Sequence, residues 1–149
     1  DTPYITFKNL EVLDDWIKHT ASTYEGKKRT LLLSEQNPNS MDYTDEALQE
    51  QAAGLAYAWK KLEACDGIDA YFAHSWIDAH FEGGLKTGLR KYPDDLDDPY
   101  GIKPSWKVFR DAGTENEKQT FEFAKEIIGI SSWSAITHSV ENIKRISDE

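Results

Sequence analysis

Five ionisable or aromatic side chains occupy alternate positions in one short segment of the chain. His74, Trp76, Asp78, His80 and Glu82 alternate with Ser, Ile, Ala and Phe, so they share one face if the segment is extended. The preceding residues 67–73 are too apolar for a surface element. A buried strand that ends in polar groups is how α/β proteins present chemistry at the carboxyl edge of a sheet. This row of alternating side chains, from His74 to Glu82, therefore predicts one wall of a functional site.

A second apolar segment also ends in a carboxylate. Residues 30–33 read Thr-Leu-Leu-Leu and lead directly into Ser34, Glu35 and Gln36. A glutamate at the end of a buried strand can serve as nucleophile or general base, and an ion pair at the strand's rim is the alternative. Two buried strands that end in polar clusters predict one shared site.

The chemistry of the row admits two readings. His74, Asp78, His80 and Glu82 are residue types that bind zinc, but a continuing strand would spread them too far for one ion unless the chain bends. We therefore expect hydrogen bonds to a polar ligand, with no metal and no cofactor. Trp76 offers a flat indole face to a sugar ring, and packing in the core is its alternative role.

Composition limits the class of protein. The chain has 149 residues and a net charge of −10, which suits one domain and disfavours nucleic acid as a partner. No apolar run reaches membrane-spanning length, and the lone Cys65 is expected to be a buried structural thiol. Residue 1 is Asp and the only methionine is Met41. We therefore expect either a processed product or a piece of a longer protein, and we favour the second.

Apolar periodicity predicts alternating strands and helices in the first half. Strands are expected at residues 4–7, 30–33 and 68–74. Asn9 is expected to cap one helix and Thr44 another, whose acidic first turn and basic last turn match the helix dipole. This order implies parallel strands joined by right-handed crossovers, hence an α/β fold.

The second half begins with a loop rich in Gly, Asp and Pro at residues 83–103, where Asp94 to Asp98 are expected to be solvated rather than to bind calcium. Pro104 opens a short helix, and Thr114 with Glu117 predicts a capping box before the next helix, whose apolar face includes Phe121. We divide the chain into a unit of residues 1–129 and an amphipathic extension of residues 130–149, with Ile136, Val140 and Ile143.

Several short motifs, in this order and spacing, resemble the C-terminal part of retaining glycoside hydrolases that have a (β/α)8 barrel. The nearest likeness is to a poorly characterised bacterial family close to clan A hydrolases, and it covers roughly residues 4–129. The motifs are Leu31-Leu-Leu-Ser-Glu-Gln36, Gln51-Ala-Ala-Gly-Leu-Ala-Tyr57, Gly67-Ile-Asp-Ala70, His74-x-Trp-x-Asp78, Glu82-Gly-Gly-Leu85 and Lys103-Pro-x-Trp106.

The resemblance implies a partial TIM barrel whose three strands correspond to strands six to eight. It implies that Glu35 is the nucleophile and that Trp76, with His74 and Asp78, contacts sugar; His80 and Glu82 join this expected substrate-binding set. The acid/base glutamate of such enzymes ends strand four, which would precede Asp1. Asp78 or Glu82 could replace it only if the geometry allowed.

Carbohydrate is therefore the expected partner, in an enzyme or in a non-catalytic carbohydrate-binding or interaction module derived from such a barrel. A metal-dependent hydrolase is a third hypothesis. An open sheet also favours self-association or contact with the rest of a barrel. An extracellular or periplasmic location would suit a parent enzyme that degrades polysaccharides.

Overall fold

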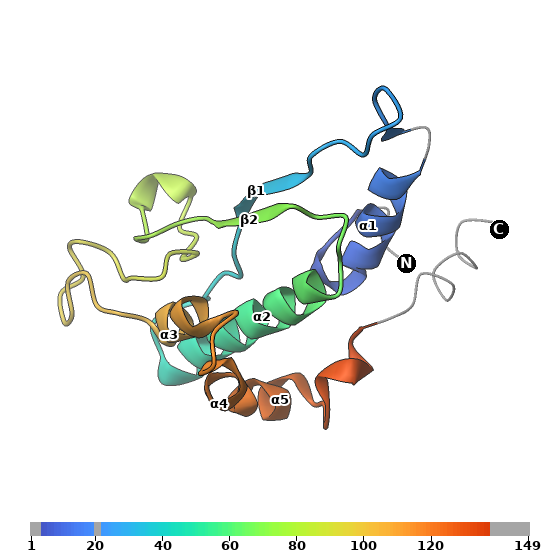
Figure 1. The fold of residues 1–149 in the computed structure, drawn as a ribbon. Helices are drawn as coiled ribbons and strands as arrows, with labels where there is room; N and C mark the ends of the chain where they lie inside the picture. The colour runs from blue at the N-terminus through green and yellow to red at the C-terminus, as the bar shows by residue number, and fades with distance from the viewer. Residues whose placement is uncertain (1–3, 20–21, 138–149) are drawn as a thin grey trace.

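A long central helix organises the computed structural model, which describes residues 4–19 and 22–137 (Figure 1). Helix α2 spans Asp45–Glu63, and Thr44 caps it by accepting a hydrogen bond from the Ala47 amide. Acidic residues occupy its first turn and basic residues its last turn, which stabilises the helix dipole. The predicted start and polarity of this helix are confirmed.

Two parallel strands lie along one side of α2. Strand β1 spans Leu32–Gln36 and β2 spans Ala70–Ala73, with Leu32 opposite Ala70 and Leu33 opposite Tyr71. The predicted parallel pair is confirmed, and the fold is mixed α/β. Strand β1 begins two residues later than expected and contains Glu35, so the carboxylate belongs to the end of the strand itself.

The strand expected at residues 4–7 is wrong. Phe7–Asn9 form a 3-10 helix, η1, which leads into helix α1, Leu10–Lys18. Thr6 and Asn9 cap η1 reciprocally: the Thr6 hydroxyl accepts from the Lys8 amide, and the Thr6 amide donates to the Asn9 side chain. These local hydrogen bonds satisfy the backbone without a partner strand. Asn9 precedes α1 as predicted, but its side chain caps no backbone group of that helix.

The core lies mainly between helices. Helix α3, Pro104–Asp111, and helix α5, Glu122–Ile128, pack against α2, and the short α4, Glu117–Thr120, joins α3 to α5. The buried apolar cluster consists of Ala52, Ala53, Leu55, Ala56, Leu89, Val108, Phe121 and Ala124. Small residues on α2 let the neighbouring helices approach closely.

The predicted capping box of Thr114 and Glu117 is wrong. Glu117 instead accepts hydrogen bonds from the indole of Trp59 at 2.8 Å and from the Gly113 amide at 2.7 Å, and it pairs with Lys60. A buried carboxylate that has one cation and two hydrogen-bond donors within reach pairs with these groups and is not available to cap a helix terminus. Glu117 therefore ties α4 to α2.

The C-terminal part of the described chain packs on the same body. The 3-10 helix η4, Trp133–Ala135, precedes the buried Ile136. The Lys61 ammonium, which has no exposed surface, donates to the carbonyls of Ile136 and Lys8 and pairs with Glu11. Val140 and Ile143 of the predicted extension lie outside the described residues.

The two faces of the sheet differ. Leu33 and Tyr71 are partners in register, and Tyr71 lines a pocket with residues of α2. Leu32 and Phe72 therefore lie on the opposite face, because neighbouring residues of a strand point to opposite sides. About half of each of these two side chains is exposed, 50% for Leu32 and 52% for Phe72. Within the described residues, no helix covers this second face (Figure 1).

Candidate functional site

The chain turns directly after β2 instead of continuing as a strand. The peptide bond between His74 and Ser75 is cis, and His80–Glu82 form a 3-10 helix, η3, that ends at Gly83 with a φ of 65°. The extended row from His74 to Glu82 is therefore wrong as a local structure. Its side chains diverge into four separate environments.

Glu35 and Glu82 both lie near His74. The Nε2 atom of His74 lies 3.8 Å from Oε1 of Glu35 and 3.3 Å from Oε1 of Glu82. The three side chains come from the end of β1, the residue after β2 and the last residue of η3. The Glu35 side chain is 72% exposed and that of Glu82 is 24% exposed. The predicted juxtaposition of the two strand-end clusters is confirmed for these three groups.

Asp78 belongs to a buried network, which corrects its assignment to a substrate-binding wall. Its side chain accepts from the Tyr43 hydroxyl at 2.7 Å and from the Gly88 amide at 2.7 Å, and it pairs with Lys103 at 2.6 Å. Neither Asp78 nor Lys103 has exposed side-chain surface. Both oxygens of Asp78 are thus engaged inside the protein, and the residue fixes the loop rather than contacts a ligand.

The partners of Asp78 carry perturbed pKa values. Burial lowers the pKa of Lys103, an effect that the neighbouring Asp78 opposes. Burial and the hydrogen bond to Asp78 raise the pKa of the Tyr43 phenol. Sequence reasoning missed Tyr43, because a lone tyrosine before a helix has no distinguishing signal.

His80 lies in a third environment. Its ring stacks on Tyr92, with centroids 4.1 Å apart, and its Nε2 lies 2.7 Å from Asp94. This hydrogen bond lowers the pKa of the Asp94 carboxyl. These contacts anchor His80, which is the first residue of η3. Glu82, the last residue of η3, lies close to His74.

Trp76 is half exposed and packs edge-to-face on Trp106, with ring centroids 4.9 Å apart. The Arg90 guanidinium lies 5.8 Å from the centroid of the Trp76 ring. Trp76 also lines a hollow of about 260 Å³ with Phe72, Leu89 and Phe109. The indole is therefore held rigidly while part of its surface stays accessible, an arrangement suited to stacking.

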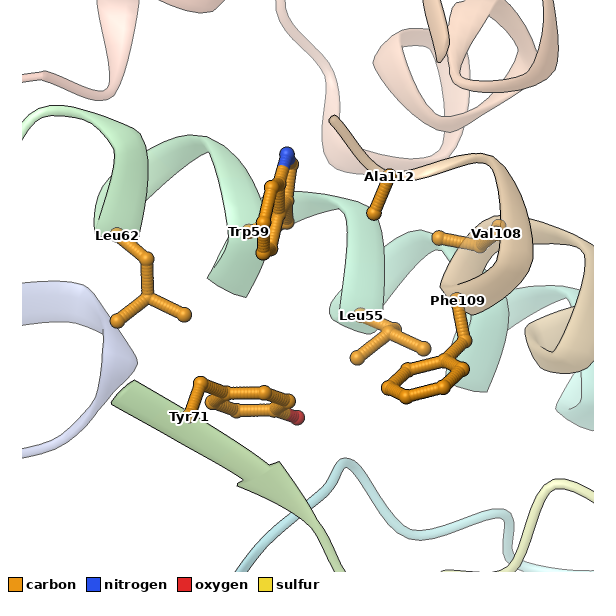
Figure 2. Close-up of a pocket in the computed structure, with 7 residues that line it drawn as sticks. All are labelled: Leu55, Trp59, Leu62, Tyr71, Val108, Phe109 and Ala112. Atoms are coloured by element: carbon orange, nitrogen blue, oxygen red, sulfur yellow. The ribbon is translucent and has the colours of Figure 1, made fainter. Parts of the chain in front are cut away.

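An apolar pocket adjoins that hollow along β2 (Figure 2). It has a volume of about 260 Å³ and is lined by Leu55, Trp59, Leu62, Tyr71, Val108, Phe109 and Ala112. A further hollow beside it is lined by residues 68–71 together with Trp59, Leu62 and Glu63. Tyr71 borders all three hollows, and its hydroxyl donates to Asn37 at 2.9 Å. The hollows thus follow β2 from Ile68 to Trp76.

Two negative observations apply to residues 4–19 and 22–137. Within these ranges, no three His, Cys, Asp or Glu side chains are arranged to hold a metal ion. In the same part of the chain, every helix is too short or too polar to span a bilayer.

Comparison with known proteins identifies the family of the chain and no individual relative. It matches no curated protein and no solved structure. The sequence model of DUF5722, a family of unknown function, matches residues 1–136 and so includes every candidate site residue. The chain therefore belongs to the DUF5722 family.

Proposed function

We propose that this chain is the C-terminal section of a glycoside hydrolase that cleaves O-glycosidic bonds in an oligosaccharide or polysaccharide with retention of configuration. The supporting observation is the Glu35 carboxylate, which is exposed at the carboxyl end of a parallel strand beside His74 and Glu82. A carboxylate in that position can reach a substrate and act as the nucleophile.

In this mechanism Glu35 attacks the anomeric carbon and the glycosidic bond breaks, which gives a covalent glycosyl-enzyme that water then hydrolyses. A second carboxyl group, about 5 to 5.5 Å from the first, protonates the leaving oxygen and then activates the water. Asp78 is excluded from this role by its burial and its partners. We assign the role to a carboxylate of an upstream strand that precedes residue 1.

The same proposal includes a partial (β/α)8 barrel, with β1 and β2 as strands seven and eight. Two observations support it: the half-exposed Leu32 and Phe72 on the face opposite α2, and the apolar hollows along β2, which pairs with β1 alone in the described residues. A barrel needs about 200 residues or more. We therefore propose that an N-terminal barrel section completes the sheet, and that in its absence a second copy of the chain covers it.

Trp76 is proposed as the sugar-stacking residue. The contacts with Trp106 and Arg90 fix the ring while half of its surface remains accessible. An indole held in this way loses little entropy when a sugar ring stacks on it.

The test is covalent trapping of the nucleophile in the full-length protein. A panel of 2,4-dinitrophenyl 2-deoxy-2-fluoroglycosides is incubated with the protein, and the labelled residue is identified by mass spectrometry. We expect one glycosyl group on Glu35, no labelling of Glu35→Gln, and a loss of turnover of at least about a thousandfold in that variant. Full glycosidase activity in Glu35→Gln, or label on another carboxylate, would refute the assignment.

A non-catalytic carbohydrate-binding module is the second candidate. The rigid, half-exposed Trp76 favours it, since stacking requires no carboxylate pair. Binding to a glycan array that disappears in Trp76→Ala, together with no turnover or labelling of the full-length protein, would favour this candidate over the hydrolase.

A further inference from the structure

The His74 imidazole has an unusual environment at the mouth of the proposed site. Its Nε2 atom is buried and makes no hydrogen bond within the described residues, although two carboxylates lie within 4 Å of it. Buried polar atoms without a partner are rare in folded proteins and call for an explanation. A small movement of either carboxylate would complete a hydrogen bond.

The burial of Nε2 restricts what His74 can do. A nitrogen that is closed to solvent is not accessible to a substrate oxygen, so it cannot exchange a proton with the substrate directly. It does face Glu35, whose side chain is largely exposed. Through this nitrogen, His74 can therefore affect the reaction by way of Glu35.

Glu82 is the second carboxylate near the same nitrogen. Its Oε1 atom is the closer of the two, at 3.3 Å, and its side chain is largely buried. The turn that carries it is anchored at the other end by the stacking of His80 on Tyr92 and by the contact of His80 with Asp94. The position of Glu82 is thus fixed by contacts that do not involve Glu35.

We propose that His74 and Glu82 are positioning residues for Glu35: the single Nε2–H of His74 is shared between the two carboxylates, and this bridge holds the Glu35 carboxylate for attack. This inference rests on the proposed hydrolase function. It reassigns both residues from contact with substrate to control of the nucleophile. An exposed carboxylate such as that of Glu35 gains from such a donor, because a misplacement of 1 Å can lower a rate about a hundredfold.

The choice of probe separates positioning from acid/base catalysis. Dinitrophenolate leaves without protonation, so labelling by 2,4-dinitrophenyl 2-deoxy-2-fluoroglycosides reports on Glu35 and is insensitive to the acid/base residue. We expect His74→Phe to label about tenfold to a hundredfold more slowly, with little change in the concentration for half-maximal labelling. His74→Gln, which retains a donor at a similar reach, should label within about threefold of the wild-type rate.

Glu82→Gln should slow labelling about threefold to tenfold, since the imidazole loses its charged partner. His19→Phe is the matched control, because His19 lies at the end of α1 and pairs with Asp15. Thermal unfolding of each variant verifies that it is folded, and Glu82→Gln decides the question if His74→Phe does not fold.

The outcomes distinguish failure of the positioning role from failure of the hydrolase proposal. If the wild-type protein is labelled and His74→Phe labels equally fast, or if His74→Gln is as slow as His74→Phe, the positioning role is wrong and the hydrolase proposal stands. An unchanged labelling rate in Glu82→Gln removes Glu82 from the role. If the wild-type protein is neither labelled nor active, the hydrolase proposal fails and this inference fails with it.

Discussion

Lys103 and Asp78 form an ion pair, 2.6 Å between Nζ and Oδ2, in which neither side chain has exposed surface. Lys103 directly precedes helix α3 and Asp78 lies in the loop after β2. The Lys103 ammonium also donates to the Lys86 carbonyl, and the Tyr43 hydroxyl donates to Asp78. This pair therefore joins the start of α3 to the loop that carries Trp76 and Glu82.

Lys103→Met should destabilise the protein by about 3 to 5 kcal/mol, because it leaves a buried carboxylate without its cation. Urea unfolding measures the change. Lys125→Met is the control: Lys125 pairs with the exposed Glu122, and its loss should cost at most about 1 kcal/mol. Equal effects of the two substitutions would contradict a structural role for the buried pair.

Glu117→Gln should lower the free energy of unfolding by about 2 kcal/mol at pH 7. Burial raises the pKa of Glu117, but hydrogen bonds from Lys60, the Gly113 amide and Trp59 outweigh it, so the pKa is lowered from 4.5. A lowered folded-state pKa gives stability that is present above the unfolded value and is lost as the pH falls through the folded value. The difference between wild type and Glu117→Gln should therefore shrink below pH 4.5 in urea titrations. A difference that is constant down to the acid transition would be inconsistent with this account.

Phe72→Lys should reduce self-association of the 149-residue chain, because it places a charge on the half-exposed sheet face that also carries Leu32. Sedimentation velocity at several concentrations measures the effect. Phe81→Lys is a matched control, since Phe81 is 88% exposed but lies on η3 rather than on the sheet. A wild-type chain that stays monomeric at high concentration would count against the uncovered face as an interface.

Trp76→Ala should weaken sugar binding about tenfold to a hundredfold, while Trp76→Phe should retain part of the affinity because an aromatic face remains. Removal of the edge-to-face contact with Trp106 should also cost about 0.5 to 1.5 kcal/mol of stability beyond the lost burial. Titration with the sugar that labels Glu35, or with the best array ligand, measures the first effect. Affinity that survives in Trp76→Ala would remove the indole from the site.

Local sequence was sufficient for the elements that depend on local interactions. Thr44, the charged turns of α2 and its apolar spacing predict that helix, because capping, dipole and periodicity act within a few residues. The apolar runs before Glu35 and His74 likewise predict two parallel strands and place Glu35 at a strand end. The burial expected of these strands is wrong, because every residue of β1 and β2 keeps some exposed surface. The same reasoning failed at Thr6, where local side-chain hydrogen bonds replace strand pairing.

Tertiary structure alone decided which polar residues meet. Alternation put five side chains on one face, but the turn after β2 sends Asp78 into the interior and His80 onto Tyr92, and only Glu82 returns to His74. The reason is physical: burial of a carboxylate depends on cations and donors that come from distant segments, here Lys103 and Tyr43. Sequence determined that two strands end in polar groups, and the packing of the loop brought Glu35, His74 and Glu82 together at the candidate site.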